Sequence, residues 1–178
     1  MNMEAIYAVD AKNGLSKDGV IPWHSKRDMN FFMNKTMHNV VIMGRKTYLS
    51  LPKRPLKNRL NIVLTRDFVV DTQEKNVLFT NNDTIYKDIL ENRDYYMSMC
   101  PSLNPDFKIF FIGGKIIYEK YIPLCETVWL TRIKKDYSCD LFFDYDYSKQ
   151  FKDEVAIEED DELKIVKIVK IMKIMKLS

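Results

Sequence analysis

The stretch Gly44-Arg45-Lys46-Thr47 combines the features of an anion-binding site. An apolar run at 40–43 precedes it and predicts a strand buried on both faces, and a helical segment through Leu51 follows it. A strand that turns into a helix at glycine leaves free backbone N–H groups, which favour an anion together with the helix dipole and nearby cations. The simpler alternative is a buried strand followed by a solvated Arg–Lys pair, and the stretch alone leaves both open.

Asp28 is a candidate acid at the start of a helix predicted over 26–36, with Ser25 as its N-cap. Its carboxylate is either a first-turn residue that stabilises the helix dipole or the acid of a pocket. Trp23 either fills the core or covers that pocket. The apolar face of this helix is predicted from helical spacing, with Asp28 at its edge, and consists of Met29, Phe32 and Met33.

Two further features are predicted at the same edge of the sheet, beyond the C-terminal ends of its strands. Arg66 follows a predicted strand at 60–65, and the pair Gly113-Gly114 follows another at 109–112. Ligands of parallel sheets bind beyond the C-terminal ends of strands, so Arg66 would join Arg45 there. Paired glycines allow close approach of backbone or ligand, although the GxGxxG fingerprint is absent from the sequence.

The elements that position these residues alternate between strand and helix, which predicts a mostly parallel sheet with helices on both faces. Residues 10–19 and 92–106 are predicted as loops, and Asp83 or Thr84 as a helix cap. The predicted strands are 5–9, 40–43, 60–65, 77–80, 109–112 and 127–133, and the predicted helices are 26–36, 45–51, 85–90 and 115–121.

The C-terminal region has an unusual repeat, because lysine recurs at every third position from 164 to 176. That period fits neither helix nor strand over its full length. We expect a short edge strand near 165–169 with a frayed end. The acidic run 158–162 is either its electrostatic partner or a solvated turn.

Composition limits the class of protein. The chain has 178 residues, 46% of them hydrophobic, and a net charge of +3, which indicates a globular chain and gives nucleic-acid binding weak support. No apolar run has the length of a transmembrane helix, and no signal peptide is recognisable. The three cysteines have no metal-site spacing and indicate a reducing, cytoplasmic setting.

Several motifs occur in the order and approximate spacing of dihydrofolate reductase, and the chain resembles that family over about residues 4–143. They are AIYAVDAKNGLSKDGVIPW, Asp28, VVIMGRKTY, RPLKNR, LNIVLTR, IFFIGGKIIYE and VWLTRI. The resemblance implies one domain over 1–178, with a twisted, mostly parallel sheet of about eight strands, an antiparallel C-terminal edge and about four helices. Region 158–178 is irregular and matches poorly.

The implied reaction is NADPH-dependent reduction of 7,8-dihydrofolate to 5,6,7,8-tetrahydrofolate, by hydride transfer to C6 with protonation at N5. The family belongs to one-carbon metabolism and is a target of antifolates. Such a protein is a cytoplasmic monomer or part of a fusion with thymidylate synthase, and it needs no metal, membrane or nucleic acid. The alternatives are a pyrimidine reductase of riboflavin synthesis and a non-catalytic, RNA- or polyanion-binding protein.

The resemblance also implies roles in the substrate site. Asp28 would bind the 2-amino and N3 groups of the pterin and support protonation, Thr131 would orient it, and Trp23 would hold a water. Arg59 would bind the α-carboxylate of the glutamate tail. Tyr118 completes the catalytic set. The implied substrate-binding residues are Ile6, Tyr7, Asp28, Phe32, Leu51, Leu56, Arg59 and Ile112.

For the cofactor, Arg45, Thr65 and Arg66 match a 2′-phosphate site, and the sequence shows no acid there that would favour NAD instead. Gly113-Gly114 matches a cis peptide, and the loop 12–21 matches a lid. The implied cofactor residues are Ala8, Leu15, Gly44, Arg45, Lys46, Thr47, Thr65, Arg66, Gly113, Gly114, Lys115 and Ile116. Two positions depart from the pattern: Asn58 replaces a usual glycine, and Tyr48 a common tryptophan.

Overall fold

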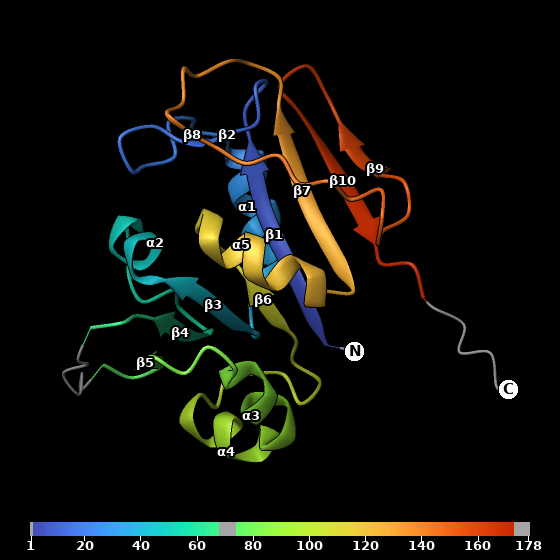
Figure 1. Ribbon diagram of the computed structural model, residues 1–178. Helices are drawn as coiled ribbons and strands as arrows, with labels where there is room; N and C mark the ends of the chain where they lie inside the picture. The colour runs from blue at the N-terminus through green and yellow to red at the C-terminus, as the bar shows by residue number, and fades with distance from the viewer. Residues whose placement is uncertain (1, 68–73, 173–178) are drawn as a thin grey trace, which may run out of the picture.

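An eight-stranded sheet forms the centre of the structure (Figure 1). The computed structural model describes residues 2–67 and 74–172. The strand order is β5-β4-β3-β6-β1-β7-β10-β9, parallel as far as β7, with β10 and β9 antiparallel at one edge. The sheet strands are β1 (Met3–Val9), β3 (Val40–Gly44), β4 (Leu60–Leu64), β5 (Val77–Thr80), β6 (Ile109–Phe111), β7 (Thr127–Ile133), β9 (Val155–Glu159) and β10 (Leu163–Val169).

Helices cover both faces of this sheet, which confirms the predicted fold class. In Figure 1, α5 crosses in front of β1 and α1 lies behind it, while α3 and α4 sit together at the lower end. A second sheet pairs β2 (Gly14–Ser16), which lies in the predicted loop 10–19, with β8 (Leu141–Phe142). The helices are α1 (Lys26–Thr36), α2 (Arg45–Ser50), α3 (Ile85–Glu91), α4 (Arg93–Met99), α5 (Lys115–Tyr121) and the 3-10 helix η1 (Ile122–Leu124).

The alternation of side chains along the strands creates a separate core on each face. Ile6 of β1 joins the cluster on the α1 face, whereas its neighbour Tyr7 joins the cluster on the α5 face with Tyr118. The described helices are all too short and too polar to cross a membrane. All three cysteines are buried and free.

Helix α1 begins where the sequence predicts, because the Ser25 side chain accepts a hydrogen bond from the backbone N–H of Asp28. The predicted buried face is wrong: Met29 is 60% exposed and Met33 is 43% exposed. Phe31 packs against the sheet instead, and Thr36 is fully buried. Positions 28, 32 and 36 share one face at helical spacing, so Asp28 lies on the inward face and not at its edge.

Helix α4 is missing from the sequence prediction, which treated 92–106 as a loop. Its only buried side chain is Tyr96, so the segment has no apolar period. The hydroxyl of Tyr96 donates to Asp88 of α3, and this tertiary contact holds the helix. Helix α3 follows Thr84, which makes no side-chain cap bond.

The C-terminal region is more regular than predicted. Strand β10 covers the expected 165–169 but lies inside the sheet, and β9 forms the edge. Antiparallel pairing places Lys164 opposite Glu159, and the acidic run also makes the turn between the strands. Pairing on both sides of β10 offsets its poor three-residue period. The expected frayed end falls at 173–178, outside the described residues.

The loop after β1 is fixed by one buried carboxylate, Asp10. Its Oδ1 accepts the backbone N–H groups of Lys12 at 2.9 Å and Gly14 at 2.8 Å. Its Oδ2 accepts the backbone N–H of Tyr137 at 3.0 Å, which ties the loop to the segment after β7. Desolvation raises the pKa of Asp10, but these bonds outweigh it, and the net pKa is lowered.

We predict that Asp10→Asn lowers the free energy of unfolding at neutral pH by about 1–3 kcal/mol, because an amide cannot accept at both oxygens. Because the pKa of Asp10 is lower in the folded protein, its ionised carboxylate stabilises the fold at pH values above the unfolded pKa of about 3.9. This stabilisation is lost as the pH falls through the folded pKa. Urea titrations at several pH values should therefore show the two proteins converging in acid. Asp106→Asn, at an exposed acid, is the control. A difference that persists unchanged in acid would contradict the prediction.

Candidate active site

Two strand-to-helix turns meet at the C-terminal edge of the sheet. The backbone N–H of Gly44, the last residue of β3, donates to the carbonyl of Gly113, after β6, at 2.8 Å. Gly113 has a φ of +125°, and a Cβ there would lie 3.1 Å from the Tyr118 hydroxyl and 3.4 Å from Thr47 Oγ1. Gly113-Gly114 is a cis peptide, as the resemblance implies. The glycines thus leave room that a side chain would fill.

Cations lie along this rim. β3 pairs with β4 in parallel, with Gly44 opposite Leu64, so Arg45 and Arg66 both follow the ends of neighbouring strands. Arg45 and Lys46 are exposed. Arg45 forms an ion pair with Asp67, and the expectation that no acid stands at this position is therefore wrong. Sequence order could have revealed Asp67, which directly follows Arg66.

A partly buried acid lies across the sheet from these turns, on the inward face of α1. Burial raises the pKa of Asp28, while the Thr131 hydroxyl and the Trp23 indole N–H, which face the carboxyl, lower it, and burial dominates. Trp23 is 5% exposed and packs with Ile133, so it belongs to the core as well as to the pocket. Its Nε1 faces the Asp28 carboxyl but makes no direct hydrogen bond of normal geometry to a described residue, so a water bridging the two would satisfy it.

Apolar side chains beside Asp28 form one continuous wall on the α1 face of the sheet. Tyr7 does not belong to it, because its ring packs on the other face, 4.9 Å from the ring of Tyr118. The Tyr118 hydroxyl donates to the carbonyl of Ile6 at 3.1 Å and so reaches the edge of the site through the backbone. The predicted members of this wall are Ile6, Phe32, Leu51, Leu56 and Ile112, and Phe31 joins them.

Arg59 lies at the far end of α1 and is only 4% exposed. Its Nη1 donates to the Thr36 hydroxyl at 3.0 Å, and its Nε donates to the carbonyl of Lys57 at 2.9 Å. Asn58 takes the left-handed φ of +55° that the turn requires. Burial lowers the pKa of Arg59, and none of the described acids forms an ion pair with it. A buried cation without a counterion favours an incoming anion.

The remaining predicted residues divide between the two sides of β1. Ala8 packs near Trp23, whereas Leu15 belongs to the cluster on the α5 face. The backbone N–H of Asp18, in the predicted lid, donates to Asp140 at 2.9 Å. At the start of α5, Lys115 is partly buried and Ile116 is 72% exposed.

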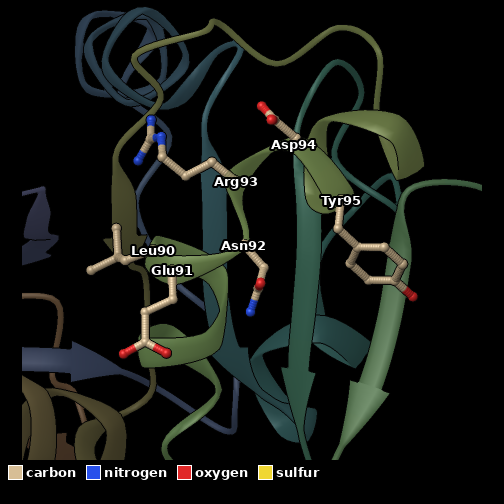
Figure 2. A pocket seen from close by; sticks show the side chains of 6 residues that line it. All are labelled: Leu90, Glu91, Asn92, Arg93, Asp94 and Tyr95. Atoms are coloured by element: carbon tan, nitrogen blue, oxygen red, sulfur yellow. The ribbon is translucent and has the colours of Figure 1, made fainter.

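A surface hollow between α3 and α4 lies elsewhere and contains none of these residues. Figure 2 shows that the side chains of Arg93, Asp94 and Tyr95 diverge from it. Arg93 donates to the carbonyls of Pro105 and Phe107. The hollow therefore lacks convergent polar groups and is not a candidate active site. The described residues also hold no His, Cys, Asp or Glu cluster that could bind a metal.

Comparison with known proteins agrees with this geometry. A family model described as dihydrofolate reductase matches residues 2–172. The chain belongs to the dihydrofolate reductase family. The family comprises NADPH-dependent oxidoreductases that reduce dihydrofolate.

Two relatives named as dihydrofolate reductases match over most of their own length. The dihydrofolate reductase of Haemophilus influenzae is 34% identical over 144 residues, which cover 80% of this chain and 79% of that protein. That of Aedes albopictus is 33% identical over 149 residues, 78% of this chain and 76% of that protein. The bifunctional dihydrofolate reductase-thymidylate synthase of Zea mays is 35% identical over 153 residues, 79% of this chain but 28% of that protein. The chain thus spans about a quarter of the bifunctional relatives.

The structure of Enterococcus faecalis dihydrofolate reductase, complexed with NADP(H) and RAB-propyl, superposes with a TM-score of 0.70 at 26% identity. The superposition covers 95% of this chain and 96% of that one. Within the dihydrofolate reductase fold, sequence reasoning missed Phe31, Thr36 and Asp67. Two of them carried a usable signal: Phe31 lies three residues after Asp28 on one helix face, and Asp67 directly follows Arg66.

We predict that Thr131→Val raises the pKa of Asp28 further, because it removes a donor to the charged carboxylate while burial remains. The measurement is a ¹³C NMR titration of the Asp28 carboxyl. Thr127→Val, the same change four residues earlier on β7, is the matched control and should leave the titration in place. An unchanged or lower pKa in Thr131→Val would show that the hydroxyl does not act on Asp28.

Proposed function

We propose that this chain catalyses the reduction of 7,8-dihydrofolate to tetrahydrofolate with NADPH, in the cytoplasm, as a single domain that diaminopyrimidine and folate-like inhibitors also occupy. The observation that carries the proposal is that two ionisable groups, neither with an ion-pair partner among the described residues, lie at opposite ends of α1. Asp28 is in its first turn, and Arg59 is held by Thr36 in its last. The family match favours this reaction over the reduction of a pyrimidine without a glutamate tail.

The rim of the sheet suits the cofactor. The space left by Gly113 and the exposed cations Arg45, Lys46 and Arg66 fit a dinucleotide with an extra phosphate. Arg45 would exchange Asp67 for the 2′-phosphate, and Thr47 would bind near the glycine pair. When bound, NADPH supplies the hydride for the reaction.

The acid pocket would act on the pterin. The Asp28 carboxylate would accept hydrogen bonds from the 2-amino and N3 groups of the ring and hold it against the apolar wall. Trp23, through its Nε1, would position a water beside Asp28, from which a proton reaches N5. Thr131 would keep the carboxyl in one orientation, and the loop 12–21 would exclude bulk water.

The first test is an assay that follows the loss of NADPH absorbance in the presence of dihydrofolate. We predict that Asp28→Asn lowers turnover at least about tenfold near neutral pH, because a neutral amide cannot support protonation, while NADPH binding is unchanged. Asp94→Asn is a matched control, since Asp94 is the first-turn acid of α4. Equal effects of the two substitutions would mean that Asp28 acts only on the helix dipole, and full activity of Asp28→Asn would refute its role.

Arg59 separates a folate site from a general pterin site. We predict that Arg59→Ala weakens dihydrofolate and glutamate-bearing inhibitors by about 1.5–3 kcal/mol, roughly ten- to a hundredfold in Kd, through loss of a charge-assisted contact. Small diaminopyrimidines, which lack the tail, should bind almost as before. The measurement is the dissociation constant of Arg59→Ala for one ligand of each kind. Arg54→Ala, at an exposed arginine of the same turn, is the control. Equal losses for both ligands would mean that Arg59 supports only the fold.

A further inference from the structure

Strand β9 ends the sheet and has one side unpaired within the described residues. It is an apolar edge: Val155 is 58% exposed and Ile157 is 46% exposed. Figure 1 shows β9 at the outer margin, with β10 beside it on the inner side only. Exposed edge strands with apolar side chains are templates for another strand, and proteins normally cover or block them.

The inner side of β9 already shows which sequence it accepts. The repeat Lys164-Ile165-Val166-Lys167 of β10 pairs with it in antiparallel register, with Lys164 opposite Glu159 and Lys167 opposite Val155. The segment around β9, residues 152–162, holds seven acids and one lysine. Several of these acids pair with cations of the same chain, but the segment retains excess negative charge. A lysine-rich apolar strand therefore matches β9 in both charge and hydrophobicity.

The same repeat continues beyond β10. Lysine, isoleucine and methionine recur from Lys170 as KIMKIMK, in the pattern that already covers one side of β9. Ile171 and Met172, the last described residues of the tail, are 46% and 82% exposed. The sequence thus continues, beyond β10, the repeat that pairs with β9.

The tail of the same molecule is badly placed to reach this edge. Lys170 pairs with Phe151 in an antiparallel bridge, and the backbone N–H of Ile171 donates to the carbonyl of Gln150. The chain after β10 therefore lies beside the segment that precedes β9. There the chain has already passed the beginning of β9 while running antiparallel to it, so the same molecule could cover the free side only by turning back as a parallel strand, whereas the repeat pairs with β9 in antiparallel register.

Self-pairing of β9 is also unfavourable. In an antiparallel pair of two β9 strands centred on Ile157, Asp160 would lie opposite Glu154, and Asp161 opposite Asp153. Like charges in directly opposed positions destabilise a sheet. The charges of this edge therefore select a cationic strand and reject a copy of themselves.

We propose that the C-terminal lysine repeat of a second copy of this chain adds as an antiparallel strand to the free edge of β9, so that reciprocal exchange of tails forms a dimer. Main-chain hydrogen bonds extend the sheet by one strand, Val155 and Ile157 become covered, and lysines meet the acidic segment. The proposal concerns assembly and does not depend on the proposed reaction.

The test is sedimentation velocity of the full chain at increasing concentration, with two variants. Truncation after Met172 removes the tail and none of the described residues. Ile157→Lys places a cation in the edge of β9, where it repels the incoming lysine repeat. The wild type should show a dimer that high salt weakens, and each variant alone should stay monomeric. Tyr95→Lys, at a tyrosine of α4 that is 61% exposed, should dimerise as the wild type does.

Mixing the two variants tests the mechanism and controls for misfolding. The truncated chain keeps an intact edge and Ile157→Lys keeps an intact tail, so the mixture should form a one-to-one complex that neither forms alone. A wild type that is monomeric at every concentration would overturn the proposal. So would a dimer that survives truncation, since another surface would then make it, or a mixture that stays monomeric.

Discussion

The structure depends on the inward face of helix α1, which has a partly buried acid at one end and contacts a buried cation at the other. Helix α1 places Asp28 in its first turn and Thr36 in its last, on the side that packs against the sheet, and Thr36 holds Arg59. Burial raises the pKa of Asp28 and lowers that of Arg59, so the environment opposes both charges. A ligand with donors at one end and a carboxylate at the other, separated by about 12 Å along eight helical residues, relieves both penalties.

The sheet provides the second half of this arrangement. Because β1, β3, β4 and β6 run parallel, their C-terminal ends lie at one edge, where the hydrogen bond from Gly44 to Gly113 joins two turns. The apolar wall behind them belongs to the α1 face, whereas the Tyr118 hydroxyl reaches the same place from the opposite layer. Residues from both layers therefore reach this edge, which favours a site there over one in the hollow between α3 and α4.

Local signals in the sequence were sufficient for most of the fold. Apolar runs located the parallel strands, and Ser25 located the start of α1, because both depend on neighbouring residues alone. The inward face of α1 was misplaced since Met29 and Met33 are apolar yet exposed, and only packing reveals that choice. Three features depend on contacts between segments that are apart in the sequence, and hydrophobic periodicity does not predict such contacts. They are helix α4, the Arg45–Asp67 ion pair and the interior position of β10. The orientation of the Tyr7 ring was not predictable from the resemblance, because neighbouring residues of a strand point to opposite faces and the ring packs against Tyr118.

The ion pair between Arg45 and Asp67 has a consequence for kinetics. An arginine that already has a partner gains less from a phosphate than a free one, because the first contact must be broken. In the proposed 2′-phosphate site, the same carboxylate would recapture the guanidinium as the phosphate departs, which would lower the barrier to dissociation. Since the spent cofactor of an oxidoreductase must leave before the next can bind, a carboxylate that competes for Arg45 would lower cofactor affinity and speed product release.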